Sequence, residues 1–438
     1  MTTRSQARRC LPCWVLLSCV LILAWTCASG WLAGPPTNSQ PLGNASGQPP
    51  GPGRSQQAGQ ETGQETGQAR ERLQAPDPAG LPAAPRRFSV MAFGDILLAR
   101  TPGLRVETLG FRYPFTGIRD LVSSADIAFA NLENPASWLG SPFPGKPGNV
   151  TFRADPATLF GLAWAGFDLV SLANNHMNDY GPRALAETLD FLDLLGVARV
   201  GAGRDLEEAR RATLVNRDGI RFAFLGYAEP IWSVIGACPA SAGRTWARIE
   251  ERFHGPLPEP LPPARPDSAK SSLAGVAIAD IQTMTDDVKR TLAVLQPDYL
   301  FVSVHWGDEL QRMPNRFQRA FGRAAIDAGA TAVLGHHPHV LQAIEKYHGG
   351  LIIYSLGNLI FDMESDLTYG TAAFDLKLED GHLVGLEIIP IRIGRGTYVP
   401  APAKVADARA ILEGIRTWSG ATGRDIQMDG GRGLLDFD

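Results

Sequence analysis

The chain has 438 residues and nearly balanced charge, with 41 Lys and Arg against 45 Asp and Glu and a net charge of −4. This composition gives no global basic footprint and excludes a generally basic nucleic-acid-binding protein. Its length would allow two domains, but the first 86 residues show no pattern of a folded domain. About 350 residues remain, enough for one large core.

The N-terminus, residues 1–30, reads as a targeting segment. Arg4, Arg8 and Arg9 precede an uncharged apolar run from Leu11 to Ala28. A basic flank before such a run predicts a signal peptide or a membrane anchor, with the rest of the chain outside the cytoplasm. We therefore expect a single-pass cell-membrane protein with an extracytoplasmic domain, or a secreted or periplasmic protein if cleavage follows Ala28-Ser29-Gly30.

Residues 31–86 are rich in Gly, Pro and Gln, a composition that cannot bury enough apolar area to offset ordering entropy. We expect a disordered linker there, and a Pro-rich surface insertion from Gly255 to Pro266. Four of the five cysteines lie in the targeting segment, which leaves Cys238 alone. A single thiol forms no internal disulfide, so the fold must depend on its core.

Strand and helix patterns alternate through the rest of the chain. Apolar runs predict strands, periodic apolar stripes predict helices, and two short turns predict hairpins. The expected strands are 88–93, 127–130, 167–172, 212–216, 220–226, 299–304, 330–334, 342–347, 351–355, 375–378 and 383–389, and the expected helices are 155–165, 182–195, 278–295 and 315–328. This alternation predicts a layered α/β fold with a mixed sheet or two stacked sheets.

Polar side chains follow several of these strands. They are Asp95 after Gly94, Glu133 after Asn131-Leu132, Asn175 and His176 with Asp179 three residues later, His305, His337 and His339. Carboxylate, amide and imidazole donors at equivalent strand ends predict a site for one or two divalent ions of intermediate hardness, namely Mn, Fe or Zn. If residues 337–339 are extended, His337 and His339 point inward and His336 points away.

These motifs resemble the CapA family of poly-γ-glutamate capsule synthesis, a branch of the calcineurin-like metallophosphoesterase fold. The matching segments are Gly94-Asp95, Asn131-Leu132-Glu133, Ala173-Asn174-Asn175-His176, His305-Trp306-Gly307-Asp308-Glu309, Gly335-His336-His337-Pro338-His339-Val340 and Ser355-Leu356-Gly357-Asn358. The resemblance implies a four-layer α/β/β/α sandwich of two mixed sheets, metallo-dependent phosphatase-like. The CapA-like domain would cover 87–362, and 363–438 would add C-terminal strands that complete the sheet, and a tail.

The resemblance also implies roles for individual residues. Asp95 and His339 would bind one metal, Asn175, His305 and His337 would bind a second, and Glu133 would bridge the two. His176 would act at a phosphoester as general acid or electrostatic stabiliser, oriented by Asp179. Related phosphatases carry Asp-x-His in the first motif, whereas here Leu97 stands in the histidine position. The first metal would therefore lack one nitrogen ligand.

Three further residues have two interpretations each. Trp306 either packs beside the site or forms a platform for substrate. Glu309 either orients a ligand histidine or caps the following helix. Asn358 either satisfies backbone groups in a tight turn or belongs to the site.

The function predicted from the sequence is that of an exported, membrane-anchored CapA-like protein in capsule or poly-γ-glutamate biosynthesis or export. The alternatives are a free-standing extracytoplasmic metal-dependent phosphoesterase, a hydrolase, and a binding module with a non-catalytic site. The expected partners are an envelope polymer or a phosphorylated small molecule, the membrane through the N-terminal segment, and membrane subunits of a polymer synthase. No nucleic acid is expected.

Overall fold

The structure is a computed structural model that describes residues 86–230 and 273–437. The predicted targeting segment, the linker up to residue 85, the Pro-rich insertion and Cys238 lie outside the described residues. Among the helices within these two ranges, none is both long and apolar enough to cross a membrane.

The larger sheet has ten strands and carries the first half of the site. Along its main path the strand order is β17-β18-β15-β14-β1-β2-β3-β4, while β13 pairs with β1 and β16 with β15. Neighbours β1 to β4 are parallel, whereas β14 and β15 run antiparallel. The bounds are β1 Arg87–Ile96, β2 Ile127–Leu132, β3 Leu169–Ser171, β4 Ala198–Val200, β13 Asn358–Ile360, β14 Gly370–Glu379, β15 His382–Ile393, β16 Pro400–Pro402, β17 Gln427–Asp429 and β18 Arg432–Asp436.

The second sheet has six strands in the order β11-β12-β10-β9-β7-β6. Its inner strands β7, β9, β10 and β12 are parallel, and β6 and β11 are antiparallel edges. The bounds are β6 Thr213–Arg217, β7 Ile220–Ala228, β9 Tyr299–His305, β10 Ala332–His336, β11 Ile344–Tyr347 and β12 Gly350–Ile353; a separate pair joins β5 Ala202–Gly203 to β8 Gly275–Val276.

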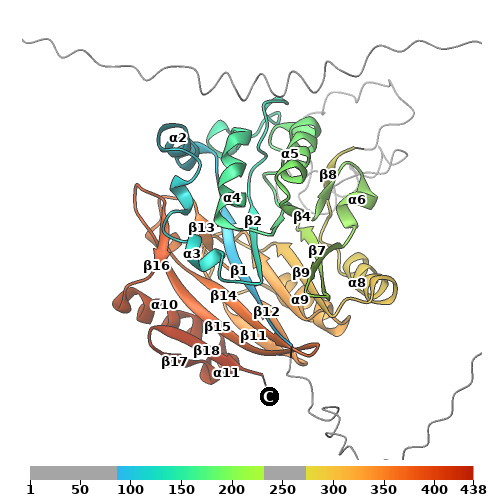
Figure 1. The fold of residues 1–438 in the computed structure, drawn as a ribbon, viewed down its shortest axis with the longest axis vertical. Helices are drawn as coiled ribbons and strands as arrows, with labels where there is room; N and C mark the ends of the chain where they lie inside the picture. Colours follow the sequence, from blue (N-terminus) through green and yellow to red (C-terminus); the bar gives the residue numbers. More distant parts are fainter. Residues whose placement is uncertain (1–85, 231–272, 438) are drawn as a thin grey trace, which may run out of the picture. The chain divides into compact units, whose positions relative to one another are not determined.

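Three apolar clusters define the layers of the described fold. One lies between the sheets, where Phe129 of β2 stacks on Phe224 of β7 with ring centroids 5.8 Å apart. A second packs the helices α4 and α5 against the other face of the larger sheet, and a third packs α8 and α9 against the second sheet (Figure 1). The predicted α/β/β/α sandwich of two mixed sheets is therefore confirmed.

The helices begin at capping residues that the sequence supplies. Asn315 and Gln318 form a reciprocal capping box at the start of α9, and the Asp280 side chain caps α8. The helices are α2 Arg100–Leu109, α3 Arg119–Val122, α4 Phe160–Ala165, α5 Gly181–Leu195, α6 Leu206–Arg210, α8 Ile281–Leu295, α9 Arg316–Asp327, α10 Val405–Trp418 and α11 Gly420–Asp425, with 3-10 turns η1 Tyr113–Phe115, η2 Gly148–Val150, η3 Pro156–Leu159 and η4 Asp366–Thr368.

Some predicted elements differ from the structure. The helix expected over 155–165 is a 3-10 turn, capped by Asp155, that continues into the six-residue α4. The predicted strands 375–378 and 383–389 are much longer, as β14 and β15. Helices α2 and α10 were not predicted. The segment after residue 393 contains α10, α11 and the hairpin β17–β18 as well as strand β16.

Candidate metal centre

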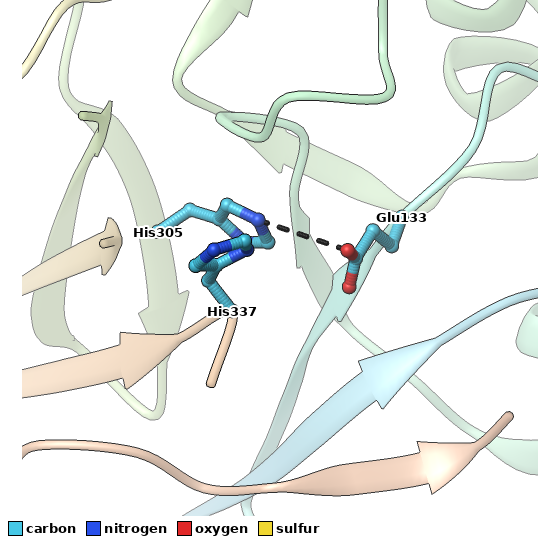
Figure 2. A group of neighbouring side chains, drawn as sticks. All are labelled: Glu133, His305 and His337. Atoms are coloured by element: carbon cyan, nitrogen blue, oxygen red, sulfur yellow. Dashed lines mark ion pairs between the residues drawn. The ribbon is translucent and has the colours of Figure 1, made fainter. Parts of the chain in front are cut away.

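The predicted ligands come together at the carboxyl ends of strands from both sheets. Asp95 lies in β1, Glu133 directly follows β2, and His305 is the last residue of β9. All three are buried, with at most 1% of the surface exposed. The ends of parallel strands are where α/β folds place their ligands. Figure 2 shows Glu133 facing His305 and His337 across a short gap.

Gly94 allows the first strand to reach this position. A Cβ atom built on Gly94 would lie 2.1 Å from the carbonyl oxygen of Gly357, which no side chain could tolerate. The close approach lets Asp95 N donate to Gly357 O at 2.9 Å, and β13 then pairs with β1 at Asp95 and Ile96. The glycine of the Gly-Asp motif is therefore required by backbone contact.

The donor atoms form two half-sites that share one carboxylate. Glu133, His305 and His337 form one set, and Asp95, Glu133 and His339 form the other, with the donor atoms of each set within 4.8 Å of one another. Glu133 Oε1 lies 3.7 Å from His305 Nε2 and 3.6 Å from His339 Nε2. These two sets bring together the carboxylates and histidines that the resemblance assigned to each metal, and a third set joins His337 and His339 to Glu309.

Asn175 adds an oxygen donor to the His305 side. Its Oδ1 lies 2.9 Å from His305 Nε2, and its side chain comes from the loop after β3. Burial lowers the pKa of His305 well below its usual range, and the neighbouring His337 lowers it further. His305 is therefore a neutral imidazole, which is the form that binds metal ions.

Asp95 is held as an anion by its neighbours. Its Oδ1 contacts His336 Nδ1 at 3.0 Å and accepts from Asn131 Nδ2 at 2.9 Å. Burial opposes ionisation, but the hydrogen bond and charge of His336, with the charge of His339, outweigh it and lower the pKa of Asp95. His336 thus contacts the predicted ligand Asp95 and keeps its carboxylate ionised.

Glu133 has the opposite environment. Burial, followed by the negative charge of Asp95, raises its pKa well above the usual range. Its Oε1 atom is buried and has no hydrogen-bond partner among the described residues. The charge of Lys146 opposes the rise in pKa without outweighing it. An ionised carboxylate is costly to bury, and a divalent cation at this position would compensate its charge.

The loop after β10 turns sharply, contrary to the extended conformation expected for residues 337–339. His337 has φ +94° and His339 has φ +56°, so both adopt left-handed backbone conformations. Each still presents its ring to the site, with the two ring centroids 5.7 Å apart. Such backbone conformations are strained for residues other than glycine, and they occur preferentially at functional sites. The inward direction of both rings was predicted, but the physical reason given for it was wrong.

His176 and Asp179 lie beside the two half-sites. His176 Nδ1 is 2.8 Å from Asp179 Oδ2, and its Nε2 lies 3.9 Å from Glu133 Oε1. Burial lowers the pKa of His176 to about 4, against the opposing hydrogen bond and charge of Asp179. The carboxylate is placed to accept the Nδ1 proton, so that Nε2 faces the site.

Lys146 and Phe152 surround the His176–Asp179 pair, and the sequence did not predict either residue as part of the site. Lys146 forms a buried ion pair with Asp179, and Phe152 N donates to Asp179 Oδ2 at 2.7 Å. The Phe152 ring stacks on His176 with centroids 4.0 Å apart. Both residues come from a loop without periodic pattern, so no sequence signal could have found them.

The remaining interpretations are resolved by contacts. Asn358 belongs to the site, because its Oδ1 lies 2.9 Å from His339 Nδ1. Trp306 is a packing residue, fully buried, whose Nε1 donates to Tyr354 O at 2.8 Å. Leu97 is fully buried within an apolar cluster and offers no donor atom to the Asp95 side. Glu309 lies at the site and is exposed.

The donor set fits a divalent ion. Carboxylate and amide oxygens combine with neutral imidazole nitrogens, and two buried donor atoms, Glu133 Oε1 and His337 Nδ1, have no hydrogen-bond partner within the described part of the chain. Buried polar atoms are normally paired, and a cation bound between these residues would satisfy both atoms. The mixed donors are compatible with Mn, Fe or Zn.

Comparison with known proteins gives one family and several relatives. Residues 89–363 match the family model described as bacterial capsule synthesis protein PGA_cap. The capsule biosynthesis protein CapA of Bacillus anthracis is 28% identical over 72% of this chain and 69% of its own. A probable polyglutamine synthesis accessory protein of Mycobacterium tuberculosis is 28% identical over 72% of this chain and 80% of its own.

Solved structures are more distant. A hypothetical protein from Thermus thermophilus superposes with a TM-score of 0.39 at 20% identity, covering 69% of this chain and 98% of its own.

Proposed function

This chain belongs to the bacterial capsule synthesis protein family PGA_cap, and from that premise we propose that it is an exported accessory protein of capsule or poly-γ-glutamate synthesis. The observation that carries the proposal is the span of the family match. Every residue of both half-sites, from Asp95 to His339, lies within residues 89–363. The metal centre and the family therefore coincide in one folded unit.

We further propose that the domain works outside the cytoplasm and is held at the membrane by residues 1–30. The basic flank and the apolar run Leu11–Ala28 support this location. The Gly- and Pro-rich stretch that follows would give the domain reach from the membrane toward a growing polymer or toward membrane subunits of its synthase.

The experiment is a deletion of the gene followed by complementation. The deletion strain should lose surface-bound anionic polymer, measured as glutamate or uronic acid released by acid hydrolysis of washed cells. Wild-type protein should restore the polymer, whereas a version without residues 1–30 should not. An unchanged polymer content in the deletion strain would contradict the proposal.

A second variant in the complementation experiment tests whether polymer synthesis requires the metal centre. His337→Ala combined with His339→Ala removes one imidazole from each half-site. If the centre is needed, this double variant should reach the envelope in normal amounts, judged by immunoblot, and still fail to restore polymer. Full restoration would assign the polymer function to other surfaces of the chain.

Hydrolysis of a phosphoester is a second candidate activity, favoured by His176 beside Glu133. Bound cations would supply Lewis acidity and charge neutralisation at phosphorus. Asp179 orients the His176 ring, and Phe152 packs on its face and keeps it in place. Nε2 is thereby positioned to exchange a proton with a reacting oxygen or to stabilise its charge.

The assay uses purified protein with Mn²⁺ or Zn²⁺ and bis-p-nitrophenyl phosphate as a generic diester. Turnover that depends on the added metal and on His176 supports a hydrolase. Protein that binds metal and hydrolyses no substrate in a broad phosphoester panel contradicts this second candidate and leaves the polymer proposal standing.

A further inference from the structure

The loop after β9 brings a third carboxylate to the metal centre. The Glu309 carboxylate and ring nitrogens of His337 and His339 lie within 4.8 Å of one another. His337 and His339 also belong to the two half-sites, one to each. Glu309 is thus an exposed carboxylate beside two buried imidazoles.

The backbone of this loop is hydrogen-bonded to the end of β10 and to the loop that carries His337 and His339. Trp306 N donates to His336 O at 3.1 Å, and Leu310 N donates to Pro338 O at 2.9 Å. Gly307 adopts φ +83°, a backbone conformation that disfavours larger residues in this turn. Glu309 is therefore held over the histidine loop by contacts on both of its sides.

The Glu309 side chain has no partner besides these two imidazoles in the described part of the chain. In the described part of the chain Glu309 makes no hydrogen bond or ion pair, whereas its neighbour Asp308 accepts from Asn315 Nδ2 at 3.1 Å. His337, one of the two rings that it faces, is 3% exposed, and its Nδ1 atom also lacks a hydrogen-bond partner. The Glu309 carboxylate and the buried His337 imidazole therefore lie side by side, and neither has a hydrogen-bond partner among the described residues. Together they can act as two ligands of one metal ion.

We propose that Glu309 is a further metal ligand, which closes the centre from its open side by binding an ion together with His337 or His339. This inference rests on the proposed metal centre and adds one residue to it. A carboxylate is a hard, anionic donor, and its addition to imidazole nitrogens suits Mn²⁺ or Zn²⁺. Its exposed position makes it a ligand that an incoming anionic group could displace without disturbing the buried donors.

The test measures metal binding and uses three proteins in the full exported form: wild type, Glu309→Gln and Asp308→Asn. Asp308→Asn is the matched control, since it removes the same charge one residue away. Isothermal titration with Zn²⁺ should show affinity lowered at least about tenfold in Glu309→Gln, because loss of supporting groups alone costs about 10–100-fold. Asp308→Asn should titrate like wild type.

Visible absorption of the Co²⁺-loaded proteins distinguishes a bound ligand from a distant charge. A ligand change should alter the band positions or intensities in Glu309→Gln and leave them unchanged in Asp308→Asn. Weaker binding with an unchanged Co²⁺ spectrum would overturn the proposal, as would equal affinity of Glu309→Gln and wild type. In both cases the metal centre itself survives, whereas wild-type protein that binds no Zn²⁺ would remove the centre and Glu309 with it.

Discussion

Glu133→Gln is the single substitution that touches both half-sites, and its effect on stability should reverse with metal. The wild-type carboxylate is fully buried, and its Oε1 has no hydrogen-bond partner among the described residues. Gln keeps the shape and removes the charge. Its amide NH₂ group would face the Nε2 atoms of His305 and His339, which lie 3.7 and 3.6 Å from Oε1.

The sign of the pH dependence follows from the raised pKa of Glu133. The folded protein binds this proton more tightly than the unfolded chain does, relative to the ordinary value of 4.5. This tighter proton binding contributes fully to the stability of the wild-type protein below pH 4.5. The contribution is lost as the pH rises through the folded-state pKa of Glu133. Without metal, the stability of Glu133→Gln relative to wild type should therefore grow with pH, by at most about 1.4 kcal/mol per pH unit for one group.

Bound metal should reverse this difference and make the wild-type protein more stable than Glu133→Gln. Saturation at 100 times Kd stabilises a one-site protein by about 2.7 kcal/mol. With about 2.1 cal/mol/K of unfolding entropy per residue over roughly 310 folded residues, that energy raises Tm by about 4 °C. Glu133→Gln should show a shift below about 1 °C because each half-site loses its shared anion.

The assay compares urea and thermal unfolding of the two proteins at several pH values between 5 and 8, in EDTA and in Mn²⁺. The reasoning is refuted if the difference in unfolding free energy without metal does not change with pH and Glu133→Gln keeps the full metal-induced rise in Tm.

Three further outcomes are expected. His337→Ala with His339→Ala should remove most bound metal, measured by elemental analysis, while His348→Ala, an exposed residue paired with Asp327, should change nothing; retained metal in the double variant would contradict the site assignment. If the centre hydrolyses phosphoesters, His176→Ala should lower kcat by about 10²–10⁴ with metal content unchanged, and equal turnover would exclude the proposed role. A reporter fused after residue 86 should be active only outside the cytoplasm, and activity in the cytoplasm would rule out the expected topology.

Much of the fold could be predicted because local pattern and tertiary structure agree. The strands that carry ligands are short apolar runs, and parallel neighbours necessarily bring their ends to one edge. Asp95 and Glu133 follow from this rule within the larger sheet, and His305 follows from the same rule in the second sheet, 210 residues from Asp95.

The parts that could not be predicted depend on contacts that are distant in sequence. Helix α2 begins at Arg100 with φ +51° and contains Pro102 and Gly103, which local propensity assigns to a turn. It is stabilised by burial of Val106 instead. Lys146 reaches Asp179 from an irregular loop, and the left-handed turns of the histidine loop have no signature in residue type.

The pairing of β1 sets a limit on how the protein can be dissected. The family match ends at residue 363, yet β1 pairs with β14 from Arg87 to Ala92, and β15 and β18 extend the sheet on the same side. A fragment cut at the end of the match would keep β2 and β13 but leave β1 without a partner on one side from Arg87 to Ala92. Such an exposed strand edge recruits other chains and promotes aggregation. A fragment that keeps this sheet intact therefore has to include β14, β15 and β18, which lie beyond the end of the family match.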